Sequence, residues 1–310
     1  IYSTCILLRG SRAEDWKCFA DFIHKVNING TIQSPSRLAI ADLAHFVPSV
    51  KGLSATARLS GKVRGPVDNL QLTHWKMAAG DSIQLEGDFS LKGLPDMQNG
   101  RIDVKIKKLH LNRPDLDSIG IFQAFGIRLP KPLQELNSAS LQGSFSGQGN
   151  LDRFIADLYL DTDLGKLHFQ NTATDTSNGE VFMNGQLQAE NIDMGRLLHK
   201  RDLFGHMDLQ TSFSMMGRKL KDMTYNVDGI IINMEIDKDM VAPLNFDLVF
   251  ARNFFAGEMA CHDPELDFRL DGIMDFRSDT SRTRYLLDLR NIDLSPLHLM
   301  DDTGFFAIQT

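Results

Sequence analysis

The strongest constraint on the fold is an alternation of apolar and polar residues that starts near Leu53 and recurs almost to the end of the chain. Runs such as 102–106 and 244–250 place an apolar side chain at every second position and are bounded by Gly, Pro, Asn or Asp. Successive side chains of a strand point to opposite faces, so this period predicts strands with one apolar face. The turn residues keep the strands short and favour antiparallel neighbours.

Four of these stretches end in a four-residue motif that combines Leu or Ile with Asp or Asn. We call this motif a box, and each box precedes a segment with helical spacing. The boxes are Ile40–Leu43, Leu109–Asn112, Asn191–Met194 and Asn291–Leu294. A recurring strand-and-turn unit predicts an elongated β architecture whose function lies in a long surface. The intervals between boxes, roughly 70, 80 and 100 residues, exclude a solenoid of fixed period.

Three segments depart from the period of two. Residues 11–26 have the spacing of an amphipathic helix, and residues 194–200 predict a short one. Residues 112–137 contain three prolines and predict a short helix followed by a proline-bounded loop. We therefore expect an N-terminal helix and lead-in strand over residues 1–46 and β units over residues 47–137, 138–200 and 201–310.

Charge and cysteine content argue against two kinds of site. A net charge of −7 is the wrong sign for a protein that tracks nucleic-acid phosphates. The three cysteines form no paired framework, although Cys5 and Cys18 could pair across a short loop. Cys261 lies beside His262 and Asp263, but a zinc site needs about four ligands at recognisable spacings. A buried thiol is the better interpretation, and no metal or cofactor is expected.

Catalytic motifs are incomplete. The segment Gly143–Gly147 has phenylalanine where a nucleophile elbow requires serine. The segment Asp161–Gly165 resembles part of a calcium loop, but its later ligands are out of place, so a turn is expected. A hydrolytic or carbohydrate-active protein that uses carboxylates such as Asp271 and Asp275 stays open as an alternative.

No apolar run approaches the roughly 18 residues that a membrane-spanning helix requires. The first residues also lack the basic region and the cleavage site of a signal peptide, and there is no initiator methionine. We expect the chain to be a piece of a longer protein, with any anchor or export signal outside it.

Residues 47–116 carry a more specific likeness. The segments Val47–Gly52, Leu59–Leu70 and Leu85–Asp96 resemble the translocation and assembly module (TamB) proteins of Bacteroidetes-type bacteria, within the AsmA-like superfamily. The segment Leu294–Phe306 is similar to the strand joins of the same proteins. The resemblance implies an inner-membrane anchor outside this chain and a periplasmic body. It also implies a U-shaped β sheet whose apolar interior shelters lipid acyl chains, and an outer-membrane barrel partner of the Omp85 class.

These observations together predict a mainly β chain with a few short helices, whose elongated, curved antiparallel sheet forms a U-shaped apolar groove. The expected function is non-catalytic: phospholipid acyl chains lie in the groove during inter-membrane transport and outer-membrane assembly. The alternative is a scaffold that binds nascent outer-membrane proteins by strand addition, at an edge position such as Thr224. The residues expected to face the groove are Leu70, Leu72, Ile83, Leu85, Phe89, Ile232, Met234, Phe246, Leu248 and Phe268.

Overall fold

The structure is a computed structural model of the chain. It describes residues 22–39, 53, 55–94, 100–124, 128, 131–148, 153–175, 179–218, 222–236, 239–241, 243–264, 266–277 and 282–292. The chain forms two compact units. The N-terminal unit comprises residues 1–130 and 136–163, and the C-terminal unit comprises residues 131–135 and 164–310.

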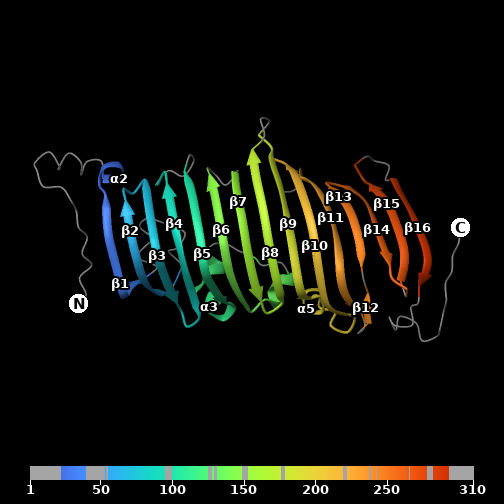
Figure 1. Cartoon of the computed structure of the whole chain (residues 1–310), viewed down its shortest axis with the longest axis horizontal. Helices are drawn as coiled ribbons and strands as arrows, with labels where there is room; N and C mark the ends of the chain where they lie inside the picture. Colours follow the sequence, from blue (N-terminus) through green and yellow to red (C-terminus); the bar gives the residue numbers. More distant parts are fainter. Residues whose placement is uncertain are drawn as a thin grey trace, which may run out of the picture. The chain divides into compact units, whose positions relative to one another are not determined.

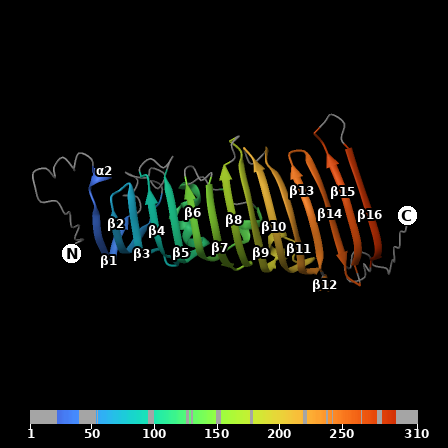
Figure 2. The ribbon, with the colours of Figure 1, turned by 45° about the horizontal axis from the view of Figure 1, so that its top comes forward.

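The N-terminal unit is a single antiparallel sheet in which each strand pairs with the next one in the chain, from β1 to β7 (Figures 1 and 2). Its strands are β1 (Ile28–Ala39), β2 (Thr56–Gly65), β3 (Asn69–Ala79), β4 (Ile83–Lys92), β5 (Arg101–Asn112), β6 (Ser138–Gln148) and β7 (Arg153–Thr162). Its helices are α2 (Phe22–Lys25), α3 (Arg113–Ile119) and α4 (Ile121–Ala124). Only α2 of the predicted helix over residues 11–26 falls within the described residues.

The C-terminal unit repeats this plan from β8 to β16, with β12 paired to β11 beside the main path. Its strands are β8 (Gly165–Asp175), β9 (Val181–Asp193), β10 (Phe204–Gly217), β11 (Thr224–Ile236), β12 (Asp239–Val241), β13 (Leu244–Ala251), β14 (Phe254–His262), β15 (Leu266–Asp275) and β16 (Arg282–Ile292). Its helices are η3 (Lys131–Glu135) and α5 (Met194–Leu198).

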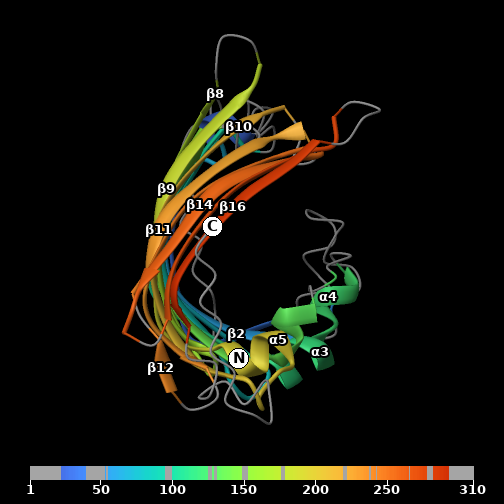
Figure 3. The same cartoon turned by 90° about the vertical axis from the view of Figure 1, so that its right-hand side faces the viewer.

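The prediction of a mainly β chain with a curved antiparallel sheet is confirmed. Within the C-terminal unit, strands such as β9, β14 and β16 bow along their length (Figure 3). The observed division of the chain differs from the predicted boundaries at residues 137 and 200. Strands β5 and β6 pair across the first of these positions, and β9 and β10 pair across the second. Helices inserted between paired strands leave the sheet continuous, so they do not separate units.

Two of the four boxes lie wholly within the described residues, and both join a strand to a helix. At the end of β9, Ile192 is buried and the carboxylate of Asp193 accepts a hydrogen bond of 2.8 Å from the backbone N–H of Arg196. Asp193 thereby caps α5. At the end of β5, α3 begins with a proline in its first turn and ends at Gly120, which has a φ of 84°. The first box and the end of the fourth lie outside the described residues.

Helix α3 covers one end of the N-terminal sheet. Ile119 packs in a buried cluster with Leu53, Ala79 and Ile83. The carboxylate of Asp115 accepts a hydrogen bond of 2.6 Å from the backbone N–H of Ser82, in the turn between β3 and β4. The face that carries Ala79 and Ile83 is therefore the face that α3 covers.

Bulges interrupt the ladders of both units, and two of them share one arrangement. His74 in β3 has a φ of 52°, and its backbone N–H donates a hydrogen bond of 2.7 Å to the carboxylate of Asp88 in β4. Asn191 in β9 has a φ of 53° and donates in the same way, at 2.7 Å, to Asp208 in β10. We call these two features clamped bulges, because a hydrogen bond to an aspartate on the next strand holds each of them. A bulge bends its strand and increases the local twist, so each clamped bulge contributes to the curvature of its sheet.

Candidate functional site: the apolar sheet faces

The cross-strand register assigns residues to faces, because directly opposed residues of neighbouring strands share a face. In the N-terminal unit, Leu72 lies opposite Phe89, Phe89 opposite Val104, and Val104 opposite Phe145. Ile83, Leu85, Phe89 and Leu91 alternate along β4 and so share this face. The five residues predicted for this part of the chain therefore lie on one face. They are Leu70, Leu72, Ile83, Leu85 and Phe89.

The C-terminal unit has an equivalent face. Phe246 lies opposite Met259, and Leu248 lies opposite Val227 and Gly257. Phe268 lies opposite Cys261, and Cys261 lies opposite Leu244. Leu244 alternates with Phe246 and Leu248 along β13, so Phe268 shares their face. Met234 lies opposite Met207, two positions from Leu209 on β10. We call these two surfaces the apolar faces and their reverse sides the polar faces.

Ile232 is the exception among the ten predicted residues. Ile231 lies opposite both Leu209 and Leu244 and so occupies the apolar face. Ile232 falls at a shift in register between β10 and β11, and it is 37% exposed. Alternation from Ile230 through Met234 does not reveal that Ile232 is off the apolar face. The bulge adds one residue to β11, so the residues that occupy the apolar face change from odd to even positions after it.

Large side chains on the apolar faces are incompletely buried. Phe246, Leu248 and Phe268 are half-buried, while Phe250 and Leu287 remain 39% and 44% exposed. A single sheet gives these side chains contacts only within their own layer. The cluster beneath α3 is a place where described residues do cover the face. Contiguous apolar surface of this kind on a folded protein marks a site for lipid or protein.

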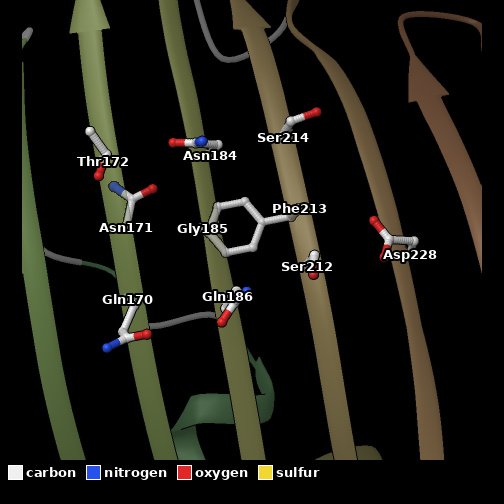
Figure 4. A pocket seen from close by; sticks show the side chains of 10 residues that line it. All are labelled: Gln170, Asn171, Thr172, Asn184, Gly185, Gln186, Ser212, Phe213, Ser214 and Asp228. Carbon is white, nitrogen blue, oxygen red and sulfur yellow. The ribbon is translucent and has the colours of Figure 1, made fainter.

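Glycines in strand interiors let large side chains lie flat on the apolar face. The ring of Phe213 in β10 extends across Gly185 in β9 (Figure 4), and a Cβ at Gly185 would lie 2.6 Å from that ring. Phe246 lies over Gly229 in the same way, with 2.8 Å for the corresponding contact. Period-two alternation does not reveal this packing of rings over glycines. The available signal was the recurrence of glycine inside strands, where it commonly marks close approach of another group.

Asn171 is a polar residue on the apolar face of the C-terminal unit, directly opposite Gly185. Its side chain is 3% exposed, and among the described residues neither its amide nitrogen nor its amide oxygen has a hydrogen-bond partner. A buried, unpaired amide costs about 1–3 kcal/mol.

The polar face of the C-terminal unit carries an open depression of about 490 Å³ (Figure 4). Its rim consists of amides, hydroxyls and one carboxylate, from Gln170, Gln186, Asn184, Ser212, Ser214 and Asp228. These residues alternate along their strands with Asn171, Gly185 and Phe213, which the register assigns to the reverse side. The depression is polar and therefore unsuited to an acyl chain.

The two carboxylates considered for hydrolysis lie on the polar face. Asp271 is opposite Glu258, and Asp275 is opposite Phe254. Four residues along one strand separate them by about 13 Å, beyond the 5–9.5 Å of glycosidase pairs. Asp275 also binds Arg277 at 2.7 Å, and this contact lowers its pKa to about 2. The alternative that requires a carboxylate pair in a groove gains no support from this geometry.

The remaining candidate ligands have structural roles. The carboxylate of Asp163 accepts hydrogen bonds from the backbone N–H groups of Asn137 and Ser138, both at 3.0 Å, as a turn residue does. Cys261 is fully buried with a free thiol, and burial raises its pKa. His262 pairs with Asp267 at 2.9 Å. Over the part of the chain that the structure describes, no group of three or more His, Cys, Asp or Glu residues could hold a metal ion.

No helix within the described ranges has both the length and the apolar composition needed to cross a membrane. The comparisons with known proteins identify no family: no family model matches the sequence, and no curated protein and no solved structure matches it.

Proposed function

We propose that the chain is a non-enzymatic, periplasmic segment of a TamB-like or AsmA-like envelope protein. In this proposal the apolar face of each unit lines a groove that shelters the acyl chains of phospholipids during transport between membranes and outer-membrane assembly. An Omp85-class barrel would be the partner of the full-length protein, and an anchor outside this chain would hold it at the inner membrane.

The observation that carries the proposal is the incompletely covered apolar face of each unit. Phe246, Leu248 and their neighbours across β11 to β15 form a continuous apolar layer whose large side chains remain half-buried. Removing apolar surface from water stabilises a complex by about 25 cal/mol per Å². An acyl chain lying along such a layer is stabilised over its whole length without any specific polar contact.

Two further features suit this function. Side chains that lie flat over glycines, as Phe213 does over Gly185, make the surface smoother. An acyl chain would slide more easily along a smooth surface. The bulges at His74 and Asn191 bend the strand that carries each of them, one in each unit. Lipid head groups would remain in water at the open side.

The test places a carboxylate on each face of the same strand. In Phe246→Asp and Leu248→Asp the new charge lies on the apolar face, whereas in Val249→Asp it lies on the polar face, opposite Ala256. We expect the first two variants to lose most of the lipid that co-purifies with the wild-type protein, and Val249→Asp to retain it. Mass spectrometry of extracted lipid and titration with a fluorescent fatty acid measure the effect.

Circular dichroism provides the folding control for all three variants. Equal lipid content in the three folded variants would refute the groove assignment. Wild-type protein that neither carries lipid nor binds the fluorescent fatty acid would refute the function itself.

A further inference from the structure

The strands from β1 to β5 in the N-terminal unit are strongly basic. They contain ten Lys or Arg residues, with one in β1, three in β2, one in β3, one in β4 and four in β5. The same strands contain three carboxylates, from Glu86, Asp88 and Asp103. The whole chain has a net charge of −7, so this excess of positive charge is local.

The register places these charges on the polar face. Arg58, Lys62 and Arg64 alternate along β2 with Leu59 and Val63, which lie opposite apolar residues of β3. Ser60, between Arg58 and Lys62, lies opposite Lys76. The charged positions of β2 and β3 therefore share the side of the sheet away from the apolar face.

Each of the three carboxylates is already paired with a cation. The pairs are Lys76 with Glu86 at 2.9 Å, Arg101 with Asp103 at 2.9 Å, and Lys107 with Asp88 at 2.8 Å. Lys107 lowers the pKa of Asp88 and Arg101 lowers the pKa of Asp103, so both carboxylates stay ionised at neutral pH. The cations without an ion pair among the described residues are all exposed: Arg37, Arg58, Lys62, Arg64, Lys92, Lys105 and Lys108.

Two of these cations lie directly opposite another cation. Arg37 on β1 is opposite Arg58 on β2, and Lys92 on β4 is opposite Arg101 on β5. Directly opposed like charges destabilise a sheet, so the fold itself gains nothing from this arrangement. A strongly basic face of this kind favours association with an anionic partner.

We propose that the polar face of the N-terminal unit binds the anionic headgroups of a lipid bilayer. Neighbouring strands lie about 4.8 Å apart and alternate residues about 7 Å apart, which is less than the Debye length in physiological salt. The fields of the exposed cations therefore add. Each Lys or Arg near an anionic leaflet strengthens binding by roughly fivefold. This interaction uses the face opposite to the apolar one and does not depend on acyl-chain binding.

Nucleic acid fits this face less well. Five strands span about 19 Å, whereas the major groove of DNA admits a helix or a two-stranded ribbon. Surfaces for single-stranded nucleic acid interleave aromatic side chains with their cations. The polar face of β2 to β5 holds no Phe, Tyr or Trp.

A protein partner is also less suitable. Lysine is depleted from the centres of protein interfaces, and Lys62, Lys92, Lys105 and Lys108 are among the unpaired cations. An anionic leaflet attracts lysine and arginine alike. Strand addition at Thr224, the alternative considered from the sequence, is not available, because β11 lies between β10 and β13.

The test measures flotation of the full chain with vesicles. One set contains phosphatidylcholine alone, and in the other about a third of it is replaced with phosphatidylglycerol. Wild-type protein should bind the anionic vesicles at least about tenfold more tightly, and about 500 mM sodium chloride should remove the difference. Lys62→Glu/Arg64→Glu should weaken binding to the anionic vesicles by at least about twentyfold, and Lys62→Gln/Arg64→Gln by less.

The control variant Lys200→Glu/Arg284→Glu makes the same charge change at exposed positions of the C-terminal unit and should bind as the wild type does. Circular dichroism checks the folding of each variant. Titration with a fluorescent fatty acid should be unchanged in Lys62→Glu/Arg64→Glu, which separates this inference from the proposed acyl-chain groove.

Three results would overturn the proposal. The first is equal binding to the two vesicle types, and the second is a preference that Lys62→Glu/Arg64→Glu shares with the control variant. The third is tighter binding to an oligonucleotide offered at the same phosphate concentration, which would assign the basic face to a nucleic acid.

Discussion

At the residue scale, the contact between Phe213 and Gly185 shows why a small residue inside a strand can be required. A side chain at Gly185 would collide with the carbonyl oxygen of Gln170 as well as with the ring of Phe213. Backbone cannot move aside as a flexible side chain can. The glycine therefore both seats the ring and preserves the ladder between β8 and β9.

Gly185→Ala should destabilise the C-terminal unit by about 1–3 kcal/mol, the usual cost of overpacking. Gly272→Ala is the matched control, because its Cβ would meet nothing closer than 3.7 Å. Urea unfolding followed by circular dichroism measures both variants. Equal midpoints for the two variants would show that the flat packing of Phe213 is not required.

At the scale of the elements, the two clamped bulges are the irregularities that alternation could not reveal. In each clamped bulge, a residue with positive φ on one strand donates its backbone N–H to an aspartate on the next strand, as Asn191 does to Asp208. The amide nitrogen of Asn233 donates to the same carboxylate at 3.0 Å. The backbone N–H of Asn191 and the side chain of Asn233 together lower the pKa of Asp208.

Asp208→Ala should reduce stability at pH 7 by about 1–2 kcal/mol, because two donors lose their acceptor. The folded-state pKa of Asp208 lies below its value in an unfolded chain, about 3.9, so the ionised carboxylate stabilises the fold. This contribution is complete above roughly pH 5 and is lost as the pH falls through the folded-state value. The difference between the urea midpoints of the wild type and the variant should therefore be smaller at pH 3 than at pH 7.

Asp202→Ala is the control, since Asp202 lies in an exposed turn. Its difference from the wild type should be small at both pH values. A difference between Asp208→Ala and the wild type that persists unchanged at pH 3 would contradict the role given to the ionised carboxylate.

The strands and the helices after the boxes were predictable, because period-two alternation and capping residues act over a few neighbouring positions. The prediction of a short helix early in residues 112–137 is confirmed by α3 and α4, whereas η3 lies in the part that was predicted to be a proline-bounded loop. Register was less predictable, since a bulge is stabilised by a partner on another strand. Ile232 is an example. Alternation along β11 predicts that Ile232 shares the apolar face with Met234, whereas the pairing of β11 with β10 and β13 places Ile231 on that face.

At the scale of the whole molecule, negative charge is concentrated as well as abundant. Asp228, Asp247, Glu258 and Asp271 lie directly opposite one another across β11, β13, β14 and β15. Like charges in directly opposed positions destabilise a sheet. This row belongs to a chain with a net charge of −7, so repulsion there is reinforced at low ionic strength.

Asp247→Asn removes the charge that has a carboxylate opposite it on each side. We expect a gain in stability of about 0.5 kcal/mol at low salt, decreasing as added salt screens the row. Thermal unfolding at 10 mM and 500 mM sodium chloride measures the effect, with Asp202→Asn as the control. Glu258 in this row is paired with Arg269 at 2.9 Å, which offsets part of the repulsion. A loss of stability in Asp247→Asn would contradict net repulsion at Asp247.

The order of the strands has a consequence for folding. Within each unit the described strands of the main path pair with their neighbours along the chain, with β12 beside the path. Contacts between neighbouring segments cost less chain entropy than contacts between distant ones. Folding of such a sheet can therefore start at any hairpin and spread outward from it.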